Sequence, residues 1–301
     1  MVGRIGELNV IEAKPLSAWG TRTWLFVLLS VCVIAPLSLF VHDYMLEALK
    51  VPYPKTPGLP MAVKFLDELV RLFALALLCR LSRPQLQGLS RIAAAFLAGL
   101  LVIMLNETLR VFSIESVVIG NWLYAALDIA PRALSLLAGG IAVAWIGLGG
   151  QKRRNVAIAI LLISALEVFV LHPALDAVAT ALKHSLSEPA PLYTGPYPFK
   201  INLIVYATFV EPTIAAFAMV AVAWPVLRHK TLRRILAFAA LLLLVRGRFF
   251  ALFVESFWVR QPLPTAFLAE SQFFLETLVL GLLVALAWSC AVRIQGGERT
   301  R

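Results

Sequence analysis

Long apolar stretches separated by short polar connections dominate the sequence. Eight stretches contain about 20 mainly apolar residues each, the length that an α-helix needs to cross a hydrocarbon core about 30 Å thick. They cover residues 23–41, 60–79, 92–112, 131–148, 156–172, 201–227, 235–254 and 263–292. The pattern predicts an all-α, polytopic transmembrane helical bundle of about eight spans, with residues 1–301 forming a single integral membrane domain. We see no internal repeat in the sequence.

The composition supports this class of protein. Hydrophobic residues make up 60% of the 301 residues and charged residues 15%, against roughly 45–50% and about 25% in a typical soluble domain. Such a chain has too few polar residues to cover a water-exposed surface, which excludes an ordinary soluble enzyme.

The net charge of +10 indicates the orientation of the chain. Most of the Lys and Arg residues fall in alternate connections, at 1–22, 80–91, 152–154, 228–234 and 293–301. Connections on the cytoplasmic side of a membrane carry such an excess of Lys and Arg. We therefore expect both termini to be cytoplasmic, with residues 1–22 as a cytoplasmic tail, and no nucleic-acid partner is needed to explain the charge. Glu7 and Glu12 argue against a cleaved signal peptide, so we expect the first span to stay as an anchor.

The external connections are expected to be more elaborate. Residues 116–130 are apolar but short for a span, so a re-entrant or interfacial helix fits them. In residues 173–186 the apolar positions recur at helical spacing, which predicts an external amphipathic helix. Residues 187–200 alternate Pro and Gly with Tyr193, Tyr197 and Phe199. This loop is expected to pack against the bundle as a lid, and it is a candidate docking surface for a membrane-protein partner.

Ionisable residues inside the predicted spans are the most informative feature. Each centrally placed charge costs about 2.5–3.5 kcal/mol to insert, so such residues normally face the bundle interior and pair with one another. In the expected topology nearly all of them lie in the external half of the membrane. Helical spacing predicts ion pairs of Arg71 with Asp67 and Glu68, of Lys64 with Glu68, and of Glu107 with Arg110. We infer a polar cavity that opens to the external side.

These charges supply the candidate site residues. Glu211, Glu276, Glu167 and His172 are the candidate catalytic groups. Arg246 and Arg248 suit an anionic group such as a phosphate or a carboxylate. The other candidate substrate-binding residues are Glu270, Arg71, Glu107 and Arg110. The alternative interpretation is that some of these charges only join helices or extend to the membrane interface.

The sequence contains no nucleotide-binding fingerprint and no metal-ligand motif, so we expect neither a cofactor nor a metal ion. Three functions fit the pattern. The first is an envelope enzyme acting on a lipid, lipid-linked or peptide substrate. The alternatives are a secondary carrier or flippase that uses the same Glu and Arg residues, and a non-catalytic membrane subunit. A short, Ala- and Leu-rich polytopic chain suits a bacterial inner membrane, where lipids surround it.

Overall fold

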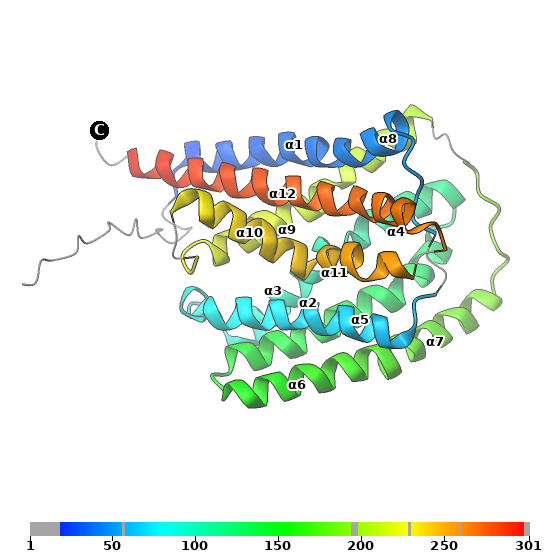
Figure 1. The fold of residues 1–301 in the computed structure, drawn as a ribbon, viewed down its shortest axis with the longest axis horizontal. Helices are drawn as coiled ribbons and strands as arrows, with labels where there is room; N and C mark the ends of the chain where they lie inside the picture. The colour runs from blue at the N-terminus through cyan, green and yellow to red at the C-terminus, as the bar shows by residue number, and fades with distance from the viewer. Residues whose placement is uncertain (1–18, 56–57, 194–197, 228–229, 259, 298–301) are drawn as a thin grey trace, which may run out of the picture.

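The computed structural model describes residues 19–55, 58–193, 198–227, 230–258 and 260–297, and within these ranges every regular element is a helix (Figure 1). The longer helices are α1 (Thr21–Asp43), α2 (Met61–Leu81), α3 (Arg91–Leu105), α4 (Thr108–Ile119), α5 (Trp122–Leu148), α6 (Arg153–Leu166), α7 (His172–His184), α8 (Phe199–Thr208), α9 (Val210–Ala223), α10 (Thr231–Val245), α11 (Arg248–Phe253) and α12 (Leu263–Gly297). The shorter ones are η2 (Tyr44–Ala48), η3 (Arg83–Leu86), η4 (Glu167–Leu171) and η5 (Glu255–Phe257). The predicted all-α class is confirmed.

Several of these helices can cross a membrane. Within the described residues, 5 helices are long and apolar enough, and the number rises to 7 if each of two bent pairs is one span. Large apolar side chains such as Leu28, Ile92 and Leu162 are 61–70% exposed. Such a surface is unsuited to water and suited to lipid. The chain is therefore a multi-pass membrane protein, while α2, with its five charged side chains, is not among these 5 to 7 spans.

Two pairs of consecutive helices are bent in a similar way. The pair α3–α4 bends by 46° and the pair α10–α11 by 77°. The first helix of each pair has 15 residues, and two residues, which we call the break, separate it from the second helix. The second residue of each break has a positive φ, 58° at Glu107 and 69° at Gly247. A non-glycine residue in this left-handed region is uncommon, so the conformation of Glu107 is held by its surroundings.

The two breaks belong to an internal structural repeat. The starts of α3 and α10 are 140 residues apart. Ser82 and Val222, which share a hydrogen bond, are separated by the same number of residues. Close to the same offset relates α2 to α8–α9, α4 to α11 and α5 to α12. The first helices of the two halves, α1–η2 and α6–η4–α7, each contain a π-helical turn. The chain thus consists of two four-part units that run in the same direction.

Contacts between the halves are reciprocal, as a two-fold axis along the bundle requires. Helix α3 packs on α9 and α10 packs on α2, while α1 packs on α12 and α6 and α7 pack on α5. The buried apolar residues form two clusters, one centred on α1, α9, α10 and α12 and the other on α2, α3, α5 and α6. Each half therefore contributes its first helix to the core of the other half.

The connections α2–α3, α5–α6 and α9–α10 lie at one end of the bundle, together with the start of α1 and the end of α12 (Figure 1, left). This grouping is the one that the charge pattern predicts. Residues 1–18 of the predicted cytoplasmic tail lie outside the described residues.

Two expectations for the opposite end need correction. Residues 116–130 form no separate re-entrant helix: they contain the end of α4, a turn at Gly120 and the start of α5. The helix expected at 173–186 exists as α7, but it continues α6 through η4, and residues 153–184 together form one candidate span. In both cases an apolar segment extends a neighbouring span, which buries its backbone polar groups in helical hydrogen bonds.

The loop 187–200 is only partly described. Leu192 donates a backbone hydrogen bond to Val118, which ties the loop to α4. Phe199 is 80% exposed, so this aromatic ring does not pack against the bundle as a lid. Tyr197 lies outside the described residues.

Candidate functional site

A charged pocket of about 610 Å³ lies between α2, α5, η4, α7 and the α10–α11 break. Both helix breaks reach it, because Asn106 from the first and Arg246 and Gly247 from the second line its wall. Five basic and five acidic side chains line it: Lys64, Arg71, Arg132, Arg246 and Arg248, and Asp67, Glu68, Glu167, Asp176 and Glu255. The pocket therefore presents both signs of charge to whatever enters it.

Helix α2 supplies an ion-pair cluster to this wall. Arg71 lies 2.6 Å from a carboxylate oxygen of Asp67 and 3.3 Å from one of Glu68, which confirms the two pairs predicted for Arg71. The predicted pair of Lys64 with Glu68 is absent from the ion pairs of the described residues. Glu68 is only 7% exposed. The charges that make α2 too polar for a lipid-facing span are thus directed to the interior.

Glu167 lies on the facing wall, in the π-helical turn η4. It is 4% exposed and accepts a hydrogen bond of 3.0 Å from Ser135 of α5. A Cβ atom at Gly139 would collide with its carboxylate, so glycine at that position gives the side chain its room. His172, one turn further along, also lines the pocket.

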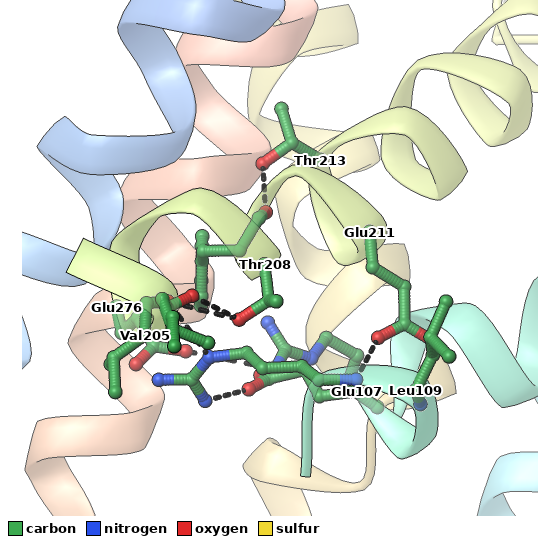
Figure 2. A network of polar contacts seen from close by, with 11 residues as sticks. Glu107, Leu109, Val205, Thr208, Glu211, Thr213 and Glu276 are labelled. Carbon is green, nitrogen blue, oxygen red and sulfur yellow. Dashed lines mark hydrogen bonds and ion pairs between the residues drawn. The ribbon is translucent and has the colours of Figure 1, made fainter. Parts of the chain in front are cut away.

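A second set of charges joins the two breaks beside the pocket (Figure 2). Arg246 at the α10–α11 break forms an ion pair with Glu107 at the α3–α4 break and lies 3.6 Å from Glu276 of α12. Glu107 also pairs with Arg110, as predicted. Glu107, Arg246 and Glu276 are all at most 6% exposed. Removing a partner from a buried charge is strongly destabilising, so this network holds the two breaks together.

Glu211 has a different position from the one expected of a catalytic base. Its two carboxylate oxygens accept hydrogen bonds from the backbone N–H groups of Leu109, at 3.1 Å, and Arg110, at 2.7 Å (Figure 2). These are free donors in the first turn of α4, where the N-cap residue supplies no side-chain bond. A carboxylate at a helix N-terminus satisfies such donors and is stabilised by the helix dipole. Glu211 therefore caps α4.

The structure divides the predicted site residues into two groups. Glu167, His172, Arg71, Arg246 and Arg248 come together at the pocket. The others, which do not line it, are Glu211, Glu276, Glu270, Glu107 and Arg110. Glu270 is buried in α12, whereas the remaining four belong to the network at the breaks.

Several lining residues are absent from the predicted site. Arg132, Glu255 and Lys64 are visible in the sequence as charges near span ends, but only the fold brings them to one pocket. Ser135 and Asn106 carry no such signal, because a single hydroxyl or amide is common in membrane helices. Among the described residues no group of three or more His, Cys, Asp or Glu side chains is placed to hold a metal ion.

Comparison with protein-family models, with curated proteins and with solved structures finds no match to this chain. The fold and the site themselves define the class: an all-helical, multi-pass integral membrane protein with charged residues buried between its helices.

Proposed function

We propose that the protein is an eight-span carrier whose solute site is the charged pocket, with both termini in the cytoplasm of a bacterial inner membrane. The observation that carries this proposal is the position of the pocket between elements of both repeats, at the α10–α11 break and against Asn106 of the α3–α4 break. Transporters commonly bind their solute at discontinuous helices at the interface between repeats, and the repeats then tilt against each other.

The repeat also supports α2 as the eighth span. Its counterpart in the second half, residues 199–223, is long and apolar enough to cross a membrane. Two units related by an axis along the bundle must cross the membrane in the same way, so α2 crosses as well. The connections rich in Lys and Arg then all lie on one side, which is the cytoplasmic side by the positive-inside rule.

A second candidate is an envelope enzyme. Glu167 and His172 line the same pocket and are the acid–base groups that such an enzyme would use on a lipid-linked or peptide substrate. Glu211 and Glu276 are weaker candidates for the base because they lie outside the lining. On this proposal Glu167→Gln abolishes turnover and leaves the fold intact.

Access to the pocket distinguishes the two functions without knowledge of the substrate. Cys32, Cys79 and Cys290 are replaced by Ala, and Ser135→Cys places a single thiol in the pocket wall. The protein is reconstituted in sealed vesicles of known orientation and treated with a membrane-impermeant thiol reagent from either side. A carrier that alternates is labelled from both sides, and an enzyme with an external site only from outside. Ala144→Cys, on the same helix but outside the pocket lining, is the control that stays unlabelled.

A further inference from the structure

Unsatisfied hydrogen-bonding atoms of both kinds are concentrated on the lining of the charged pocket. The buried donors without a partner are Nε of Arg71, Nε and Nη1 of Arg246 and Nε of Arg248. The buried acceptors without a partner are Oδ1 of Asp67, Oε1 of Glu68 and Oε2 of Glu167. Buried polar atoms normally have hydrogen-bond partners, and charged ones most of all. These atoms therefore indicate a preformed binding site, with hydrogen-bond donors in one half and acceptors in the other.

The donors and acceptors come from different elements. Arg246 and Arg248 lie at the α10–α11 break, whereas Glu68 comes from α2 and Glu167 from η4. Arg248 forms no ion pair within the described residues, and its guanidinium stacks on Phe273 at 4.8 Å. It thus keeps its charge available to an anion. Ser135 fixes the other oxygen of Glu167, which leaves Oε2 to a cation.

We propose that the pocket binds a small zwitterion, a molecule with one anionic group and one ammonium group. The anionic group, a carboxylate or a phosphate, binds Arg248 and the free N–H groups of Arg246. The ammonium group binds Glu68 and Glu167. The lining has five groups of each sign. A ligand with a single charge therefore pairs with the groups of one half only, and it also lies close to groups of its own sign in the other half.

This inference rests on the proposed function in one respect, that the pocket is the ligand site. The pocket volume of about 610 Å³ falls within the usual range for small-molecule sites. Amino acids and phosphoethanolamine both have the required pair of groups. Phosphoethanolamine is available as a free solute or as the headgroup of a lipid, and the test separates these sources.

The test is titration calorimetry on the full-length protein in phosphatidylglycerol nanodiscs. O-phosphoethanolamine is compared with inorganic phosphate and ethanolamine, and L-leucine with 4-methylpentanoate and isoamylamine. We expect at least one zwitterion to bind about tenfold or more tightly than both of its fragments, because each charged hydrogen-bonded contact contributes at least that factor. A fragment that binds as tightly as its parent, or no binding by either zwitterion, overturns the proposal.

Nanodiscs that contain phosphatidylethanolamine identify the source of the ligand. If the lipid headgroup occupies the site, binding of O-phosphoethanolamine is lost in these discs; if a free solute does, binding is unchanged. Both results require the zwitterion to bind in the phosphatidylglycerol discs.

Variants assign the two halves of the site. Arg248→Gln lowers the affinity for the zwitterion to near that of its amine fragment, and Arg248→Lys restores most of it. Glu167→Gln lowers it to near that of the anionic fragment. Glu115→Gln is the matched acidic control, because Glu115 occupies the position of Glu255 in the other repeat but does not line the pocket; exposed Arg154→Gln is the basic control. Wild-type affinity in both Arg248→Gln and Glu167→Gln overturns the proposal.

The outcomes also separate this inference from the carrier. If the Ser135→Cys thiol is labelled from one side only while the zwitterion binds, the carrier fails and the ligand class stands. If the thiol is labelled from both sides and no zwitterion binds, the ligand class fails and the carrier stands.

Discussion

The hydroxyl of Ser82 donates a hydrogen bond of 3.2 Å to the backbone carbonyl of Val222, 140 residues away, which is the separation between the starts of α3 and α10 in the two repeats. Equivalent residues can touch only where they lie next to the symmetry axis. Glu107 and Arg246, which pair at the two breaks, lie within one residue of equivalence. The halves therefore meet along the axis at two levels, one at the end of α2 and one beside the charged pocket.

The ion pair between Glu107 and Arg246 is expected to stabilise the fold. Glu107→Gln leaves the buried Arg246 with Glu276 alone, at 3.6 Å, and Arg246→Gln leaves Glu107 with Arg110 alone, so each variant is expected to cost up to about 3–5 kcal/mol. The double variant is expected to cost clearly less than the sum of the two, because neither charge then remains. Reversible unfolding in mixed micelles measures all three free energies.

Lys183 and Asp128 provide the control for this cycle. Their ion pair of 2.5 Å is partly exposed, with 20% and 45% of the side chains accessible. Exposed pairs contribute about 0–1 kcal/mol, so Lys183→Gln is expected to have a small effect. Strict additivity of the Glu107 and Arg246 variants contradicts the network.

Glu211 is expected to act as a helix cap. Glu211→Ala removes the acceptor for two backbone N–H groups of α4 and is expected to lower the free energy of unfolding by about 0.5–2 kcal/mol. Glu211→Gln keeps one acceptor oxygen and is expected to be milder and to retain function. Thermal unfolding and vesicle assays measure these effects. Loss of function in Glu211→Gln with unchanged stability contradicts this role and restores Glu211 as a candidate catalytic base.

The helical class was predictable because the apolar stretches have the length of a membrane span. The repeat was not, because the two halves share few identical residues at equivalent positions; Glu115-Ser116 and Glu255-Ser256 are one such trace. Ser116 and Ser256 even make the same hydroxyl bond, to the carbonyls of Phe112 and Leu252. In membrane helices, apolar residues of similar size can replace one another with little change in stability, so two repeats can share a fold while having few identical residues.

The candidate site was predictable only in its composition. Ionisable residues in spans identify the buried charges, and helical spacing identifies the pairs within one helix. The sequence gives no distance between helices, so it did not separate Glu211, which bonds to backbone, from Glu167, which lines the pocket. Nor did it reveal the breaks, because residues 106–107 and 246–247 include one glycine and no proline.

Gly247 is expected to be essential to the second break. Its φ of 69° strains any residue with a side chain, and a Cβ there would lie 2.7 Å from Oδ1 of Asp67. We expect Gly247→Ala to cost at least the roughly 1–2 kcal/mol of a left-handed residue and to displace Asp67 from the pocket wall. Gly88→Ala is the control, because nothing lies within 4 Å of its Cβ position. Equal stability of the two variants in thermal unfolding contradicts this role.

The crossing of α2 decides between seven and eight spans. Lys55, before α2, and Gln87, after it, are both exposed, so each accepts a single cysteine in the background without Cys32, Cys79 and Cys290. If α2 crosses, an impermeant thiol reagent labels Lys55→Cys and Gln87→Cys from opposite sides of sealed vesicles, with Gln87→Cys on the cytoplasmic side. Gln151→Cys, between α5 and α6, is labelled on the same side as Gln87→Cys because the connections rich in Lys and Arg share one end of the bundle. Labelling of Lys55→Cys and Gln87→Cys from one side contradicts the eighth span, and with it the two-fold arrangement of the repeats in the membrane.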